Sequence, residues 1–403
     1  MSLRKIISKS TNLLLVLFVL FTVLPVKVNL SSTAIILLII LSIIDFFLAE
    51  KFSILNNKLN IFIVTLPLVV YSIGLFNTSN LDYGLSFLER NLSLLAFPII
   101  FYSLFNYVDK EKVLKAYIIG LAAVNIYLIY LFLYYFNFGT KFYMIVTTDI
   151  YHSTYLGMYN LFAFWICFFY QPKKNNLLFN LLAIFFIISA IITSSRIIFL
   201  LSIISLFLTG FILIKSKIKR IAAATFTALL VVVIVLTVPS IKQKFNQIIE
   251  IEKYSFDKDN YQSVSSRFGK IEATLLIIKK NLWFGTGTGD LIDNLVIEYE
   301  NMDFVMGYKY RYNPHNQYLD NIARNGIIGG GISLISIFLW PFILSIRNKN
   351  PLLLAFMFVL SGVCLTESVL NVHKGITFYA FFVTFLINIS NYKNGNLIIN
   401  NNE

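Results

Sequence analysis

The chain has 403 residues, of which 58% are apolar and only 13% are charged, and its mean hydropathy is +0.76. Soluble domains carry about twice that share of charged residues, so the composition excludes an ordinary water-soluble fold. Apolar runs of membrane-spanning length recur along the whole chain. We therefore expect one all-α transmembrane domain over residues 1–403.

The apolar runs predict about twelve transmembrane helices. The first run follows Arg4, Lys5 and Lys9, as in a signal peptide, but no small-residue cleavage site comes after it, so we expect an uncleaved span. The expected spans are 11–27, 31–49, 59–76, 84–105, 113–136, 154–170, 177–194, 197–214, 220–238, 327–346, 351–370 and 375–390.

Lys and Arg give an independent test of the topology, because short cytoplasmic loops are enriched in them. With the N-terminus inside, the inside segments hold 17 of these residues and the short outside segments hold 4. Both termini are therefore expected in the cytoplasm. The net charge of +13 follows mainly from this asymmetry, so it does not indicate nucleic-acid binding.

Residues 239–326, between the ninth and tenth spans, are too polar to cross a membrane and form one large outward loop. Over 265–281, apolar residues recur every three to four positions, which predicts an amphipathic helix on the membrane surface. A glycine-rich string, 285–289, follows it. This string lacks the lysine of a phosphate-binding loop, so a tight turn is the favoured interpretation over nucleotide binding.

Acidic and aromatic residues mix from 291 to 312. Aromatic faces with flanking carboxylates suit sugar rings, but tyrosines that anchor the loop at the interface explain the pattern equally well. The residues are Asp293, Glu298, Tyr299, Glu300, Asp303, Tyr308, Tyr310 and Tyr312.

His315 is the main candidate for a general base. Asn313 and Pro314 suit the N-cap and first position of a helix, which would place His315 in the first turn. The helix dipole there favours a neutral imidazole that can accept a proton. Capping or packing is the competing interpretation. His152 and His373 also lie near outward helix ends but lack a comparable surrounding pattern.

Arg196 lies between two spans that have almost no loop between them. Ser194 or Ser195 can cap the next helix, so the arginine and the free N–H groups of that helix would converge on an anion site. The competing interpretation is an arginine that extends to the membrane surface.

Three further charges fall in the outer parts of spans. Glu89 and Arg90 are explained by a structural ion pair, with a direct ligand role as the alternative. Glu367 has no evident partner and is a candidate supporting residue.

Several of these residues together resemble the O-antigen ligase and polymerase superfamily of bacterial envelope glycosyltransferases. The resemblance covers most of the chain from the fourth span onward, and this sequence departs from the family pattern at Arg324 and Asn325. The residues that carry the resemblance are His315, Asn316, Gln317, Tyr318 and Leu319 with Gly326 and Gly329; Ser195 and Arg196; Arg267 with 283–287; and, more weakly, 151–159 and 89–98.

The resemblance implies a GT-C-type architecture with one large periplasmic loop. It also implies transfer of a glycan from undecaprenyl pyrophosphate to an acceptor hydroxyl, first of all O-antigen ligation onto lipid A-core. His315 would be the base, and Arg196 and Arg267, with Arg90 as a further candidate, would bind the pyrophosphate. The candidate supporting residues are Asn316, Tyr318, Ser195 and Glu367.

A good leaving group and a positioned base predict direct displacement with inversion. No His/Asp cluster has metal-ligand spacing and two arginines can replace a cation, so we expect no metal or other cofactor. The expected partners are the lipid-linked donor, the lipid A-core or another glycan acceptor, and membrane lipids. The expected location is the bacterial inner membrane, with the active site on the periplasmic side.

Three alternatives remain at this point. The nearest is a polymerase of the same superfamily that joins repeat units of a surface polysaccharide. A flippase or other transporter would show charges spread through two related halves, which the sequence lacks. An inactive binding or scaffold protein would require His315 to be dispensable.

Overall fold

The computed structural model describes residues 3–25, 30–48, 58–135, 152–170, 176–193, 195–216 and 265–391, together with 218, 219 and 225. These residues are helical or lie in turns, and none of them forms a strand. The first helices are α1 (Leu3–Val23), α2 (Leu30–Leu48), α3 (Lys58–Ile73), η1 (Gly74–Asn77), α4 (Leu81–Asn91), α5 (Ser93–Leu104), η2 (Phe105–Tyr107) and α6 (Lys110–Tyr135).

The remaining elements divide into a second set of apolar helices and a group of short amphipathic ones. The former are α8 (Ser153–Phe169), α9 (Asn176–Ile192), α10 (Arg196–Leu213), α16 (Gln317–Leu334), η6 (Ile335–Leu339), α17 (Trp340–Arg347), α18 (Pro351–Cys364), η7 (Val369–Asn371) and α19 (His373–Asn391). The latter are α13 (Ser265–Lys280), α14 (Leu291–Asn301) and α15 (Val305–Lys309).

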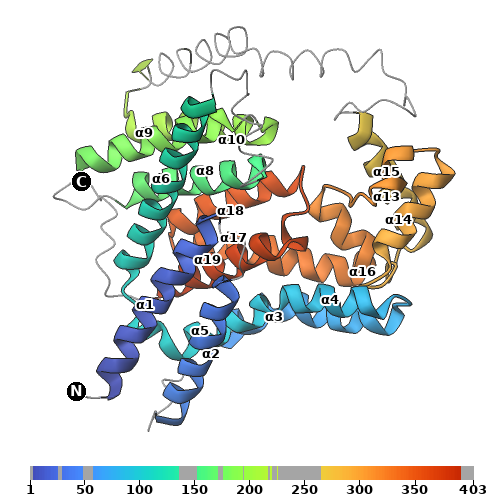
Figure 1. Ribbon diagram of the computed structural model, residues 1–403, viewed down its shortest axis with the longest axis horizontal. Coiled ribbons are helices and arrows are strands. Elements are labelled where there is room, and N and C mark those ends of the chain that lie inside the picture. The colour runs from blue at the N-terminus through green and yellow to red at the C-terminus, as the bar shows by residue number, and fades with distance from the viewer. Residues whose placement is uncertain are drawn as a thin grey trace.

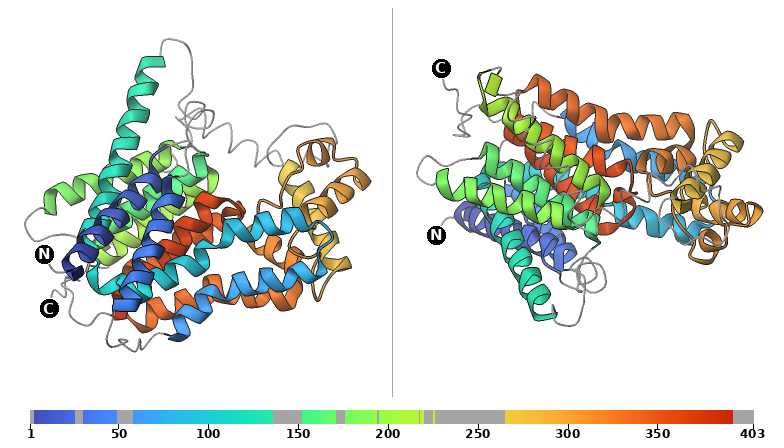
Figure 2. Two further views of the ribbon diagram at one scale, coloured as in Figure 1. Left: turned by 60° about the horizontal axis from the view of Figure 1, so that its bottom comes forward. Right: turned by 90° about the horizontal axis from the view of Figure 1, so that it is seen from above.

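The apolar helices form one bundle, and α13–α15 gather beyond one end of it (Figures 1 and 2). Helices α3, α4 and α16 extend toward this group, and α13 packs on both α14 and α16. Helices α8, α9 and α10 pack together on another side, with α8 and α10 both against α18. The short helices thus lie where segments from distant parts of the sequence meet.

Helix α19 lies at the centre of the bundle. Its apolar residues are buried on all sides, as expected for a helix surrounded by other helices. The ring of Phe381, for example, lies 4.8 Å from that of Phe18 of α1 in a tilted contact and 5.2 Å from that of Phe97 of α5 in an edge contact, measured between ring centroids. These ring contacts join the first and last parts of the chain.

Seven helices are long and apolar enough to cross a membrane, and four shorter apolar helices accompany them. The chain is therefore an all-helical, multi-pass membrane protein. These eleven helices correspond to all expected spans except 220–238, which lies outside the described residues apart from residue 225, as does all of 239–264. The expected count of about twelve and the complete outward loop stay predictions.

The glycine-rich string forms a tight turn, as expected. Gly285 and Gly287 have φ of 72° and 96°, a region that side chains disfavour. The N–H of Gly287 donates to the carbonyl of Arg324 at 3.0 Å, and the N–H of Thr288 donates to that of Gly74 at 3.2 Å. The turn therefore joins α13 and α14 to both α16 and the end of α3.

Helix α16 changes direction at Gly326, whose φ is 67°. A Cβ there would meet the carbonyl of Trp283 at 2.1 Å, so the chain approaches too closely for any other residue. Residues 317–325 thus form a short helix at the end of the bundle, and the continuous apolar part begins at Ile327. This agrees with the expected start of the tenth span.

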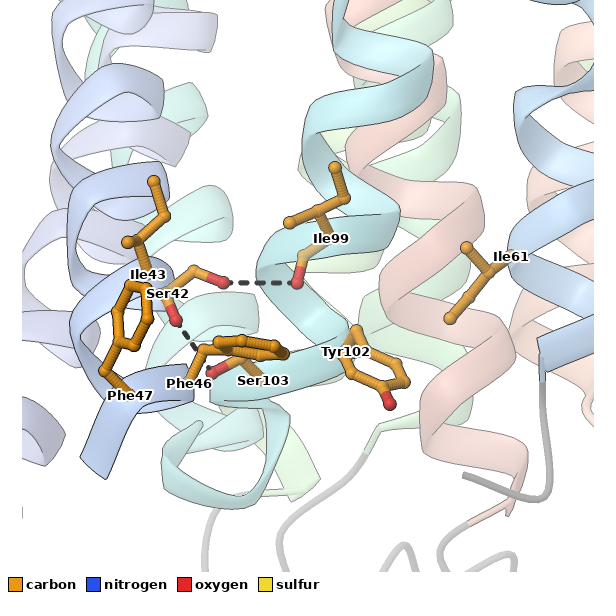
Figure 3. Close-up of a pocket in the computed structure, with 8 residues that line it drawn as sticks. All are labelled: Ser42, Ile43, Phe46, Phe47, Ile61, Ile99, Tyr102 and Ser103. Carbon is orange, nitrogen blue, oxygen red and sulfur yellow. Dashed lines mark hydrogen bonds between the residues drawn. The ribbon is translucent and has the colours of Figure 1, made fainter. Parts of the chain in front are cut away.

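A separate apolar groove of about 570 Å³ opens between α2, α3 and α5 (Figure 3). Ser42 donates to the carbonyl of Ile99 at 3.3 Å, and Ser103 donates to the carbonyl of Ser42 at 3.3 Å. The groove lies toward the C-terminal end of α2, whereas Ser32, near the other end of α2, lies beside His373. It is therefore away from the charged end of the bundle described next.

Candidate active site

The turn before α16 presents His315. The helix begins later than expected: Asn316 is the N-cap, and its Oδ1 accepts from the N–H groups of Tyr318 and Leu319, both at 3.0 Å. The expectation that Asn313 caps the helix and that His315 lies in its first turn is therefore wrong. Instead, Asn313 accepts from the N–H of His315 at 3.0 Å.

His315 adopts φ of 49°, a left-handed conformation that costs a side-chain-bearing residue about 1 kcal/mol. Such conformations persist where the surrounding structure holds them, and they concentrate at functional sites. Asn316 anchors the same turn by donating from Nδ2 to the carbonyl of Leu365 at 3.1 Å. The turn is thus held against the segment that follows α18.

Glu367 lies in that segment, beyond the end of α18, and is the partner that sequence reasoning did not find. Nδ1 of His315 is 3.3 Å from Oε2 of Glu367. Because a carboxylate only accepts, Nδ1 is the donor in this contact, and in the neutral imidazole Nε2 then holds the lone pair. Burial opposes ionisation of Glu367, but the hydrogen bond and charges of His315, His152 and Lys270 hold its pKa below the usual value.

Helix α13 carries two cations one turn apart, Arg267 and Lys270. Burial lowers the pKa of the Arg267 guanidinium, and the charge of Glu367 partly offsets this effect. Lys270 is only 7% exposed, and its ammonium lies 4.0 Å from the centre of the Tyr312 ring. The sequence pattern marked Lys270 only as a charge on an amphipathic helix, so its proximity to Arg267 and Glu367 comes from the structure.

Arg196 is the first residue of α10, as expected, and Ser195 is its N-cap. The hydroxyl of Ser195 does not cap the helix but shares a hydrogen bond of 3.1 Å with that of Thr154 at the start of α8. Arg196 lies close enough to Arg267 for their charges to repel. Ser194 lies outside the described residues.

Charges from four separate elements therefore meet at one end of the bundle. Glu367 interacts through charge with Arg267 and Lys270 from α13 and with His315 from the turn before α16. Arg196 from α10 interacts in the same way with Arg267. Three cations with a single carboxylate leave an excess of positive charge. Such a cluster suits an anionic ligand.

Arg90 has a different environment. It donates to Ser86 at 3.2 Å, and its guanidinium lies 5.5 Å from the ring of Tyr83. Arg90 and Glu89 form no ion pair in the structure, so the expected pair between these two described residues is wrong. Its charge acts instead on His373, at the start of α19.

Tyr318 supports the site from α16. Its hydroxyl donates to the carbonyl of Ser361 in α18 at 3.0 Å, and its ring packs 4.8 Å from that of Phe338. It therefore ties the short helix that follows His315 to the helix that precedes Glu367. This contact agrees with a supporting role.

Most of the mixed acidic and aromatic residues have structural partners. Glu298 pairs with Lys280, and Asp293 pairs with Arg311. Tyr299 is fully buried, whereas Tyr310 is 54% exposed. Tyr310, which stacks on Tyr312, therefore keeps part of its surface available to a sugar or to the membrane interface.

Helix α13 has apolar residues on two faces, one buried against neighbouring helices and one exposed. Ala273 and Ile277 are buried against the neighbouring helices. Phe268 and Leu275 are exposed and belong to the predicted apolar stripe. Trp283, just after the helix, is exposed as well. Contact of these exposed residues with the membrane surface stays a prediction.

Among the described residues, no group of three or more His, Cys, Asp or Glu side chains is placed to hold a metal ion. Glu367 has two histidines near it, but His315 uses Nδ1 toward the carboxylate and His152 interacts with it only through charge. The expected independence of metal ions stays a prediction.

Comparison with known proteins gives one family match. Residues 181–334 match the family model described as O-antigen ligase. The match includes Arg196, Arg267, Lys270 and His315, while Glu367 lies outside it. No curated protein matches the chain. The resemblance derived from the sequence is thus confirmed over this region: the chain is a multi-pass membrane protein whose residues 181–334 are similar to the O-antigen ligase family.

Proposed function

We propose that the protein transfers a glycan from undecaprenyl pyrophosphate to an acceptor hydroxyl, with O-antigen ligation onto lipid A-core as the first candidate reaction. The observation that carries the proposal is the hydrogen bond between His315 and Glu367 beside the cations Arg196 and Arg267. A base next to an excess of positive charge suits a reaction that removes a proton and releases a pyrophosphate.

His315 acts as the general base. Glu367 accepts from Nδ1–H, which orients the imidazole and stabilises the imidazolium that forms. Nε2 takes the proton of the acceptor hydroxyl as the oxygen attacks the anomeric carbon. General bases of this kind contribute about 10²–10⁴-fold to rate.

Arg196 and Arg267 act on the leaving group. As the new bond forms between the acceptor oxygen and the anomeric carbon, the bond from that carbon to the pyrophosphate oxygen breaks. Its electron pair goes to the pyrophosphate, whose growing negative charge the guanidinium groups stabilise. Attack opposite to the leaving group inverts the anomeric configuration.

The proposed location follows from the placement of these groups. The cations belong to the beginning of an apolar helix, α10, and to an amphipathic helix with an exposed apolar stripe, α13. A lipid-linked pyrophosphate presents its charge at such a boundary between bilayer and water. We infer that the site faces the periplasm at the inner membrane, with both termini in the cytoplasm.

The test replaces His315 by Ala in the native host and analyses surface glycans and lipid A-core by gel. Loss of capped core, with polymer length preserved on the lipid carrier, supports ligation. Single-repeat glycans would instead identify a polymerase of the same superfamily. Unchanged glycans would contradict both functions.

A further inference from the structure

Lys270 has an environment unlike that of the other described lysines. It is the one lysine that the described residues bury, at 7% exposure, although it belongs to a helix at the edge of the fold. Lys279 and Lys280 at the end of the same helix are exposed. Lysine is rarely buried without a partner, because removing its charge from water is costly.

No ion pair or hydrogen bond with the described residues compensates this burial, since Glu367 acts on Lys270 only through its charge. The side chain of Lys270 forms neither an ion pair nor a hydrogen bond with any of them. Its ammonium faces the ring of Tyr312 at 4.0 Å, a contact that leaves the hydrogen-bonding capacity of Nζ unused. Lys270 nevertheless keeps 7% of its surface exposed.

The charged and titratable groups that face Lys270 come from three elements. Arg267 of α13 repels the ammonium, Glu367 after α18 attracts it, and Tyr312 before α16 covers it. Burial, together with Arg267, lowers the pKa of Lys270 to about 8. The side chain is thus a cation at neutral pH, held beside the arginine proposed to bind the donor.

We propose that Lys270 is a third cation of the donor site and binds a phosphate oxygen of the lipid-linked pyrophosphate. Three positions apart on one helix, Lys270 and Arg267 lie on the same face and can contact one anion together. The identity of the ligand as a lipid-linked pyrophosphate rests on the proposed function. The binding of a diphosphate rests on Lys270 and Arg267, which form no ion pair with the described residues.

This role makes donor binding sensitive to alkaline pH. Lys270 binds the anion only when protonated, and its pKa of about 8 lies below the ordinary value for lysine. Affinity is therefore full well below pH 8 and falls as the pH rises through and beyond it. A bound anion stabilises the ammonium, so the decline in the complex begins at a somewhat higher pH than in the free protein.

The test compares three variants of the full-length protein in nanodiscs: Lys270→Met, Lys270→Arg and the control Lys279→Met, which removes an exposed charge from the same helix. Binding of inorganic pyrophosphate and of undecaprenyl pyrophosphate is measured at several pH values. We expect K270M to weaken both by about tenfold or more, since one charge-assisted hydrogen bond is lost. K279M should bind as the wild type does.

The arginine variant provides a second readout if K270M folds poorly. Arginine stays protonated, so K270R should keep its affinity between pH 8 and 9.5, where that of the wild type declines. Equal pyrophosphate affinity in K270M and K279M, identical alkaline profiles in K270R and the wild type, or no pyrophosphate binding by the wild type would each contradict the proposal. If the Lys270 effects hold but His315→Ala leaves glycan transfer intact, the diphosphate site stands and the proposed reaction falls.

Discussion

Arg324 and Lys270 are the one arginine and the one lysine that the described residues bury, and they are held in opposite ways. Arg324 is fully enclosed in α16, pairs with Asp320 at 3.3 Å and donates to the carbonyl of Thr288. Its guanidinium also lies 4.1 Å from the ring of Phe87. Lys270 has the ring of Tyr312 beside its ammonium but forms no ion pair with any residue that the structure describes.

The comparison separates charges that hold the fold from charges that remain available for a ligand. Asp320 is satisfied on its other oxygen by Asn371, which donates at 2.6 Å, so the Arg324 pair is complete within the protein. Complete pairs of this kind fix the arrangement of helices. Arg267 and Lys270 form no such pair among the described residues, so they remain available for an anion from outside. We call these two cations the incomplete cluster and the Arg324–Asp320 contact the complete pair.

The largest expected effect concerns the base beside the incomplete cluster. His315→Gln removes the proton acceptor at Nε2 and should lower kcat about 10²–10⁴-fold, because general-base assistance is lost. Transfer of radiolabelled glycan by the purified protein measures this change. Donor binding and the melting temperature should stay close to those of the wild type, and a variant with more than half of the wild-type rate would contradict the assignment.

Substitutions in the buried Arg324–Asp320 pair should lower the stability of the fold. Arg324→Met leaves Asp320 buried without its cation and should destabilise the protein by about 3–5 kcal/mol. The double variant Arg324→Met/Asp320→Leu should regain part of this loss, since no unpaired charge remains. Thermal unfolding in detergent measures both, and equal melting temperatures of the wild type and the single variant would show that the pair does not hold the fold.

Substitutions of Arg267 or Lys270 should lower activity without lowering the stability of the fold. Arg267→Gln should lower kcat/KM for the lipid-linked donor by about tenfold or more, as expected for one lost charge-assisted hydrogen bond. Arg311→Gln is the matched control: it removes an exposed arginine of the same region that pairs with Asp293. Similar losses in the two variants would mean that general charge, rather than this position, determines the rate.

The smallest effect is expected at Arg90. Its contacts are with Ser86, Tyr83 and His373 rather than with Arg196 or Arg267. Arg90→Gln should therefore change kcat/KM by less than about threefold, with little change in stability for a half-buried polar contact. A loss as large as that of Arg267→Gln would extend the donor site to α4.

The sequence predicts the helices well because each apolar run must bury its backbone polar groups in a helix when it enters a membrane. It also makes His315 and Arg196 candidate site residues, since titratable residues near the ends of apolar runs are few, and the family resemblance adds Arg267. What it cannot supply is their mutual placement. Arg196 and Arg267 are separated along the chain by many residues, and the packing of α10 on α18 and of α13 on α16 places their helices.

Two local signals compete before α16, which explains the error there. Asn313 followed by Pro314 and Asn316 followed by Gln317 are both acceptable helix starts. Tertiary contacts decide between them: Asn316 donates to the carbonyl of Leu365, and His315 reaches Glu367. The same long-range contacts supply the partner that the sequence could not assign to Glu367.

Cryo-electron microscopy of the protein with bound undecaprenyl pyrophosphate tests the central claim most directly. The account predicts that the diphosphate lies between Arg196 and Arg267, with Lys270 in contact with a phosphate oxygen. Nε2 of His315 should face the position that the anomeric carbon of a donor would occupy. A diphosphate bound at Arg90, or one that leaves Arg267 and His315 without contact to the ligand pocket, would contradict it.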